Sequence, residues 1–402
     1  MSHNPRIIHL QSLAAAAEEM KGLGVDLRGI ERMAPKALHF VVRLEGVSSK
    51  AANILKQEML ALGGDAALSR GAADFSPGLA DVLLLGTWKQ LFSLTERLLD
   101  QPFGLNDLSR EIEGALRNYQ CPPALLRCRR HSFDLGQGTL IVGILNVTPD
   151  SFYDGGRYLD PGAACEHAQR MVEEGADLID IGGESSRPGS PPIPIEEEWS
   201  RIASPLKALV KGLKVPIVVD TYKAEVARRA LAEGADLIND ISGLRVESDL
   251  AEEVARAGAG LVIMHMKGTP RTMQEDPHYD CLLGEIIGYL RKAVAQAEEA
   301  GIDPHGIIVD PGLGFGKRYE HNLILLKRLS EFKVLGKPIL VGPSRKSFIG
   351  KVLDLPVEER LEGTAAAVAA SILHGASLVR VHDVKPMRRV VRMVDAISRV
   401  EG

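Results

Sequence analysis

From residue 139 onward, short apolar runs alternate with longer stretches in which apolar residues recur at helical spacing. The short runs are nearly continuous in Val, Ile and Leu, which is typical of parallel strands buried on both faces. The eight runs cover residues 139–147, 176–182, 215–220, 235–241, 260–266, 306–312, 337–342 and 377–383. Eight strand–helix units in about 270 residues predict an α/β fold, a (β/α)8 TIM barrel. An open, doubly wound parallel sheet shares this alternation and is the alternative fold.

The stretches between these runs carry helix start and stop signals. Pro161 suits the first turn of a helix that Gly175 ends, and Gly234 ends a second helix of the same design. Residues 281–301 and 321–332 place Leu and Ile at helical spacing. The clean count of eight strands favours the barrel over the open sheet.

Residues 1–120 fall outside this series. Apolar runs at 6–10, 39–46 and 81–87 predict strands, and residues 48–64 and 88–100 predict helices. Ser48 or Ser49 is the expected cap of the first helix. We expect a smaller N-terminal α/β module, a linker over 121–131 and the barrel over 132–402. The module shows no catalytic cluster, which favours a scaffold, dimerisation or regulatory role.

Composition and charge narrow the class of protein. The 402 residues carry a formal net charge of −5, so there is no general basic field for nucleic acid. The short basic run at 125–131 is interpreted as a solvated linker. The sequence contains no apolar run of about 18 residues and no signal-like start, which predicts a cytoplasmic protein without a membrane partner. The four cysteines form no CxxC pair and are expected to be structural thiols: Cys121, Cys128, Cys165 and Cys281.

Polar residues stand at the ends of the predicted barrel strands, where barrel enzymes place their functional groups. Asp220, Asn239 and Asp310 come from three strands and should converge at the barrel mouth. A 2-amino-pyrimidinone edge offers the paired N–H donors that a buried carboxylate can accept. Lys346 and Arg380 are expected to pair with these acids, face ring acceptors or stack on a ring. The segments SRPG (186–189) and SRKS (344–347) provide cations and N–H groups suited to an anion.

Each of these residues also has an ordinary structural interpretation. An acid at a strand end can cap a helix or close a turn, and His265 between two methionines is expected to be a packed histidine. Residues 310–317 lack the spacing of a Walker-type phosphate loop, and no HExxH pair indicates zinc. However, seven such segments occur together in one order. Their joint occurrence favours a functional site over separate structural roles for each residue.

Those segments are GILNVTPDSFYDGG (143–156), DLIDIGGESSRPGS (177–190), NDISG (239–243), MHMKGTP (264–270), VDPGLGFGK (309–317), GPSRKSFIG (342–350) and RVHDV (380–384). In this order they resemble the dihydropteroate synthase family from about Ser132 to the C-terminus. Ser186 stands where many members have Thr, and it keeps the hydroxyl group.

The resemblance implies a transferase that joins p-aminobenzoate to 6-hydroxymethyl-7,8-dihydropterin diphosphate and releases diphosphate, with Mg²⁺ as cofactor. It implies a pterin-binding set of Asp220, Asn239, Asp310 and Lys346, with Arg380 stacking on the ring and Asp180 in support. Asn146 is similar to the family's Mg²⁺ contact, and Arg380 with His382 would hold the diphosphate. The p-aminobenzoate side would comprise Phe152, Ser186, Arg187, Pro188, Phe315 and Ser347, with Ser347 on the carboxylate. The family resemblance also implies a homodimer formed through the barrel.

The expected chemistry needs no protein nucleophile. Diphosphate would leave as Mg²⁺ and cations take up its charge, and the aniline nitrogen would attack a delocalised pterin cation. A concerted displacement stays open. The first two loops should close over the site, with Asp154 and Arg187 as a clamp. The alternatives are a barrel that moves a methyl group from a methyl-pterin to a corrinoid protein, and a non-catalytic pterin-binding regulator.

Overall fold

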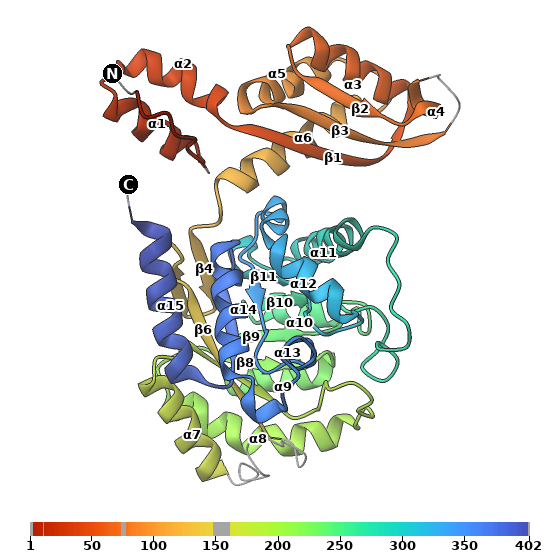
Figure 1. Ribbon diagram of the computed structural model, residues 1–402. Coiled ribbons are helices and arrows are strands. Elements are labelled where there is room, and N and C mark those ends of the chain that lie inside the picture. Colours follow the sequence, from red (N-terminus) through yellow and green to blue (C-terminus); the bar gives the residue numbers. More distant parts are fainter. Residues whose placement is uncertain (1–2, 11, 74–77, 148–160, 401–402) are drawn as a thin grey trace. The chain divides into compact units, whose positions relative to one another are not determined.

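The computed structural model describes residues 3–10, 12–73, 78–147 and 161–400 (Figure 1). Contacts divide the chain into two compact units, Met1–Cys121 and Pro122–Gly402. None of the helices in the described parts combines the length and apolarity that a membrane span requires.

The second unit is a closed barrel of eight parallel strands (Figure 1). The strands are β6 (Leu140–Asn146), β7 (Leu178–Gly182), β8 (Ile217–Asp220), β9 (Leu237–Asp240), β10 (Gly260–Met264), β11 (Ile307–Asp310), β12 (Leu340–Val341) and β13 (Leu378–Val381). Their order in the sheet is β11-β10-β9-β8-β7-β6-β13-β12, and a parallel bridge between Val309 and Ile339 closes the ring. Each strand falls within one of the eight predicted runs, so the barrel is confirmed and the open sheet was the wrong alternative.

Helices surround the strands as the sequence pattern predicts. They are α7 (Pro161–Glu173), α8 (Ile195–Gly212), α9 (Ala224–Glu233), α10 (Leu250–Arg256), α11 (Leu282–Glu299), α12 (Tyr319–Lys327), α13 (Ser347–Leu353), α14 (Leu361–Leu373) and α15 (Val384–Arg399). Gly234 ends α9 in the left-handed conformation with φ 113°, which glycine adopts without the strain of a Cβ atom. The helix expected over 321–332 ends at Lys327, and a 3₁₀ segment follows at Leu329–Leu335.

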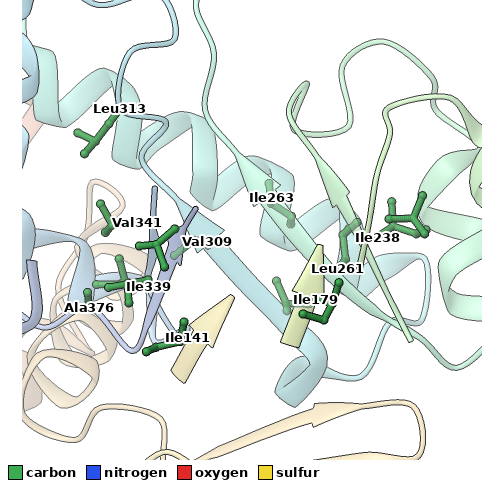
Figure 2. Close-up of a cluster of buried hydrophobic side chains, with 14 of the residues drawn as sticks. Ile141, Ile179, Ile238, Leu261, Ile263, Val309, Leu313, Ile339, Val341 and Ala376 are labelled. Carbon is green, nitrogen blue, oxygen red and sulfur yellow. The ribbon is translucent and has the colours of Figure 1, made fainter. Parts of the chain in front are cut away.

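Successive side chains of a strand point to opposite faces of the sheet, so the apolar side chains of the barrel form two layers. Figure 2 shows outward-facing residues such as Ile141, Ile179 and Ile263, which lie in the large cluster formed by the strands and the helices. The residues next to them, such as Val142, Leu178 and Val262, form a second cluster inside the barrel. The inner cluster fills the barrel floor, so only the C-terminal ends of the strands are left to form a site.

A hairpin covers the barrel floor where the sequence predicted a linker. It consists of β4 (Leu125–Cys128) and β5 (His131–Asp134), and Leu126 and Cys128 are fully buried in the inner cluster. Arg129 donates to the backbone oxygens of Leu231 and Ala235 at 3.0 and 2.9 Å, and Arg130 pairs with buried Asp236 at 3.0 Å. The basic run is therefore a hairpin anchored to the barrel, and its three arginines keep exposed surface as expected.

The first unit has its own sheet and core. Its elements are α1 (Leu13–Gly22), α2 (Leu27–Ala37), β1 (His39–Ser48), α3 (Ser49–Ala61), β2 (Asp65–Leu68), α4 (Arg70–Ala73), β3 (Leu79–Thr87), α5 (Trp88–Leu98) and α6 (Leu105–Gln120). The antiparallel sheet has the order β1-β3-β2, and α3, α5 and α6 share one buried cluster with it. Ser48 caps α3 as expected. The strand expected at 6–10 is wrong: this segment pairs with no described strand, and Ile7 is fully exposed.

Candidate active site

The polar residues of the barrel mouth follow a simple register. Each lies two positions beyond an apolar side chain of the inner cluster, so it points inward one layer higher. The pairs are Leu178 and Asp180, Val218 and Asp220, Leu237 and Asn239, Ile308 and Asp310, and Leu378 and Arg380. Strand periodicity thus brings three carboxyl groups, one amide and one guanidinium to the same end of the barrel.

Arg380 links two of the acids. Its Nε atom donates to Oδ2 of Asp180, and its Nη2 atom donates to Oδ2 of Asp220 at 3.2 Å. Asp180 is buried, whereas the side chains of Asp220 and Arg380 keep 13% and 22% of their surface exposed to the mouth. Burial and the charge of Asp180 raise the pKa of Asp220 to about 8, against the opposing effect of Arg380. Burial also raises the pKa of Asp180.

Asn239 and Asp310 complete the acceptors of the mouth. The buried Oδ1 atom of Asn239 has no hydrogen-bond partner among the described residues, and neither has Oδ1 of Asp180. Buried polar atoms are costly to leave unpaired, so these two oxygens indicate a ligand with donors. Asp310 uses Oδ1 to accept from the Gly312 amide at 2.7 Å, and burial raises its pKa.

Lys346 is the second cation of the mouth. Its Nζ atom donates to the backbone oxygen of Leu313 and lies 4.5 Å from the centroid of the Phe315 ring. Burial lowers the pKa of Lys346 to about 8, although the charge of Asp310 favours the protonated form. The mouth therefore holds an aspartate and a lysine whose pKa values are both shifted to about 8.

His382 lies behind this group. Its Nδ1 atom is 2.9 Å from the Ser344 hydroxyl, and its amide donates to the same oxygen at 3.2 Å. Burial and the charge of Arg380 lower the pKa of His382 to about 3, so this histidine is neutral. The positive charge of Arg187 acts on it in the same direction. His265 is a packed histidine as expected: it is buried, 2.9 Å from Nζ of Lys317 and edge-on to Tyr289.

The remaining predicted residues lie on the loops at the same end of the barrel. Ser186, Arg187 and Pro188 follow β7, with Arg187 and Pro188 exposed. Phe315 follows β11 and is half-buried, and Ser347 begins α13 and is exposed. Asn146 ends β6 with a half-buried side chain. Phe152 and Asp154 lie outside the described residues.

Sequence reasoning missed a buried ion network beneath the loop after β7. Lys223 donates from Nζ to Glu184 at 2.5 Å, to Glu198 at 2.6 Å and to the backbone oxygen of Ile193 at 2.6 Å. Tyr222 donates to Glu184 at 2.7 Å. The network fixes both ends of the loop that carries Ser186. The available signal was the pair of charged residues Glu184 and Lys223, each two or three residues beyond the end of a buried strand.

A second missed contact supports the loop after β12. Arg345 has a left-handed backbone with φ 53° and is buried. Its guanidinium binds both carboxylate oxygens of Asp383 at 2.8 and 2.9 Å and two backbone oxygens at 357 and 358. This bidentate pair joins the segments that carry Lys346 and His382.

Comparison with known proteins agrees with this arrangement. Residues 142–382 match the family described as pterin binding enzyme. A dihydropteroate synthase of Synechocystis is 46% identical over 285 residues, which cover 71% of this chain and 98% of that protein. A probable bifunctional folylpolyglutamate synthase/dihydropteroate synthase of Halobacterium salinarum is 40% identical over 388 residues, 96% of this chain and 46% of that protein. This second match includes most of the N-terminal unit.

Solved structures give the same result. Dihydropteroate synthase of Clostridium difficile, determined in the presence of pteroic acid, is 44% identical with a TM-score of 0.63, covering 67% of this chain and all of that one. The Xanthomonas albilineans enzyme with 4-aminobenzoic acid is 40% identical with a TM-score of 0.64, covering 69% and 99%. The sequence, the fold and the polar residues of the barrel mouth all agree with these comparisons. The chain belongs to the dihydropteroate synthase family of pterin-binding transferases.

Proposed function

We propose that this barrel condenses 6-hydroxymethyl-7,8-dihydropterin diphosphate with p-aminobenzoate to give 7,8-dihydropteroate and diphosphate. The observation that carries the proposal is the inward set of Asp180, Asp220, Asn239, Asp310 and Arg380, which includes two unpaired buried oxygens. Relatives crystallised with pteroic acid and with 4-aminobenzoic acid support both halves of the reaction.

The pterin ring is proposed to occupy the barrel mouth. Its amino-pyrimidinone edge supplies N–H donors for Asp220, Asp310 and the free oxygen of Asn239. Lys346 faces the ring acceptors from the other side, and the Arg380 guanidinium, held by two carboxylates, presents a planar cation for stacking.

Bond cleavage at the pterin methylene is proposed to precede bond formation. The C–O bond to diphosphate breaks, and its electron pair leaves with the diphosphate. The carboxylates around the ring stabilise the delocalised cation that remains. The arylamine nitrogen then forms the new C–N bond and loses one proton to solvent or to the departing phosphate. Because an aniline is neutral at pH 7, no strong base is required.

Mg²⁺ is part of this proposal. Asn146 has the same strand parity as Val142 and Ile144 of β6, so its side chain points toward the mouth. One amide oxygen, together with water and phosphate oxygens of a substrate, is the kind of shell that Mg²⁺ prefers. When bound there, Mg²⁺ would neutralise charge that develops on the departing diphosphate. Arg380, with His382 beside it, would face the same anion.

The arylamine is proposed to lie between the loops after β7, β11 and β12. Pro188 and Phe315 supply apolar contact, Ser186 and Arg187 border the ring, and the Ser347 hydroxyl faces the carboxylate. Phe152 is assigned to the same side by family resemblance, and Asp154 is proposed to clamp the first two loops together with Arg187.

We also propose that the protein is a homodimer in the cytoplasm. Exposed apolar residues on neighbouring helices support an interface through the barrel: Leu373 on α14, with Met393 and Ile397 on α15. The four cysteines are free thiols, which suits a reducing compartment. Light scattering of the full chain and of Met393→Glu tests the dimer, which the variant should weaken.

The decisive assay follows diphosphate release from the pterin diphosphate with and without p-aminobenzoate and Mg²⁺. We expect release that requires both. Methyl transfer from a methyl-pterin to a corrinoid protein would favour the first alternative function. Tight pterin binding without any arylamine-dependent release would favour a regulator.

A further inference from the structure

A cavity of about 480 Å³ lies on the outside of the barrel, and none of the residues that line it belongs to the mouth. It opens between the end of α7 and the first half of α15 (Figure 1). The described residues that line it are all charged: Arg170, Glu173, Glu174, Lys385, Arg388, Arg389 and Arg392. Ligand pockets are usually lined mainly by apolar side chains, so a lining of this kind suits a charged molecule.

Arg388 fixes one wall of the cavity. Its guanidinium binds both carboxylate oxygens of Asp177 at 3.2 and 3.4 Å, and Asp177 accepts from the Ile141 amide at 2.8 Å. Gly175 lets the arginine pass close to the backbone, since a Cβ atom there would lie 2.9 Å from Cγ of Arg388. These contacts join α15 to the turn that follows α7, so the cavity is held in shape by the fold.

Three other cations keep their charge available. Lys385, Arg389 and Arg392 are exposed, and their side chains form no hydrogen bond or ion pair with any residue that the structure describes. The acids of the lining do not neutralise them: Glu173 accepts from Gln169 at 3.3 Å, and neither acid forms an ion pair within the described part of the chain. Five cations and two acids leave a net of three positive charges in the lining.

The sequence of α15 maintains this charge against the stability of its own helix. Arg388, Arg389 and Arg392 follow Lys385 at spacings of three, four and seven residues, so four cations share one helix face. Like charges four residues apart repel, and cations near the start of a helix oppose its dipole. The first turn of α15 contains no acid, whereas α8 begins with three glutamates. An anion in the cavity would relieve both penalties, and a local arrangement that costs stability is typical of a functional site.

We infer that this cavity binds an anion with a chain of two or three phosphate groups, either free or attached to a nucleoside. Four of the five cations are arginines, whose planar guanidinium groups bind two phosphate oxygens at once. A chain of this kind carries about three or four negative charges near neutral pH, which matches the net charge of the lining. The volume lies within the range of roughly 300–1,000 Å³ that small-molecule sites occupy. The site is separate from the mouth and does not depend on the reaction proposed there.

Calorimetric titration of the full chain with inorganic triphosphate tests the site. The cavity variant is Arg389→Glu with Arg392→Glu, and the matched control is Arg291→Glu with Lys292→Glu, two neighbouring exposed cations on α11. We expect the Kd for triphosphate in the cavity to rise at least about tenfold in the cavity variant and to stay unchanged in the control. Any binding in the mouth is common to the three proteins, so the difference between them reports the cavity. Neither double variant should change kcat/KM for p-aminobenzoate.

Lys385→Glu provides a second variant if the double substitution unfolds α15, which thermal unfolding checks. ATP is titrated beside inorganic triphosphate: tighter binding of ATP indicates a nucleotide, and equal or weaker binding indicates the free anion. Equal affinities in the unchanged chain and the cavity variant, or equal losses in both double variants, would overturn the site. Tighter binding of a triglutamate peptide than of triphosphate would overturn its assignment to phosphate.

Discussion

The Nη2 atom of Arg380 donates to Oδ2 of Asp220 at 3.2 Å, although β6 and β7 separate their strands in the barrel wall. The bond therefore crosses the barrel interior. Since Nε of the same guanidinium binds Asp180, one cation bridges two acidic side chains from neighbouring strands. The arrangement gives both of these acids a hydrogen bond to one guanidinium at the floor of the proposed pterin pocket.

Replacing this cation should cost both stability and activity. Arg380→Met leaves buried Asp180 without a counter-charge, which should lower the free energy of unfolding by about 3–5 kcal/mol. Turnover should fall below detection, because the ring and the diphosphate both lose their cation. Urea denaturation and steady-state kinetics measure the two effects. Adding Asp180→Asn should restore part of the stability but not the activity; an Arg380→Met protein with unchanged stability would contradict the pairing.

The acid cluster should make stability depend on pH. Asp220 has a pKa of about 8 when folded and about 3.8 when unfolded, so between these values the folded state holds more protons. The free energy of unfolding should therefore decrease as pH rises from about 4 to about 8. In Asp220→Asn this decrease should be smaller. Denaturation curves at pH 5 and pH 8 for both proteins test the sign, and equal slopes would argue against a protonated Asp220.

The network beneath the loop after β7 predicts a selective kinetic defect. Lys223→Met removes the group that holds Glu184 and Glu198, so the KM for p-aminobenzoate should rise about tenfold while the KM for the pterin diphosphate changes little. Stability should fall by about 3 kcal/mol, because two buried carboxylates lose their partner.

An exposed ion pair provides the control for that variant. Lys207 pairs with Glu233 at 3.8 Å on the surface, so Lys207→Met should change stability by less than about 1 kcal/mol and leave both KM values unchanged. Equal increases of both KM values in Lys223→Met would show a general structural defect rather than loop positioning.

The proposed metal contact predicts a changed Mg²⁺ requirement. Asn146→Ala removes the amide oxygen, so the Mg²⁺ concentration that gives half-maximal rate should rise several-fold, whereas the rate at saturating Mg²⁺ falls less. A titration of Mg²⁺ against initial rate measures both quantities. Chelation of divalent ions should abolish turnover in either protein, and an unchanged titration in Asn146→Ala would remove this residue from the metal site.

The barrel and the polar mouth could be predicted from sequence because both depend on strand periodicity. A buried parallel strand is a continuous apolar run, and an inward acid must lie two residues beyond an inward apolar residue, as Asp310 lies beyond Ile308. Asp240 is an acid at the end of the same strand that does not belong to the mouth. It neighbours Asn239 but faces the other way, and its carboxylate binds the amides of Ser242 and Leu244 at 2.7 and 2.6 Å.

The features missed from sequence depend on tertiary partners. The run at 125–131 is basic in composition, yet Leu126 and Cys128 alternate with the exposed Arg127 and Arg129, and only the open barrel floor explains why Leu126 and Cys128 are buried. Residues 6–10 have a strand-like composition, but no described neighbour pairs with them. The partnership of Lys223 with Glu198 joins residues 25 positions apart, which no local pattern records.

The most direct test of the account is the mass of the product made by the full chain from pterin diphosphate, p-aminobenzoate and Mg²⁺. We expect a single new compound with the mass of 7,8-dihydropteroate, formed in step with diphosphate and absent with Arg380→Met. Diphosphate release without a pterin–arylamine adduct, or no conversion by a folded protein that binds the pterin, would contradict it.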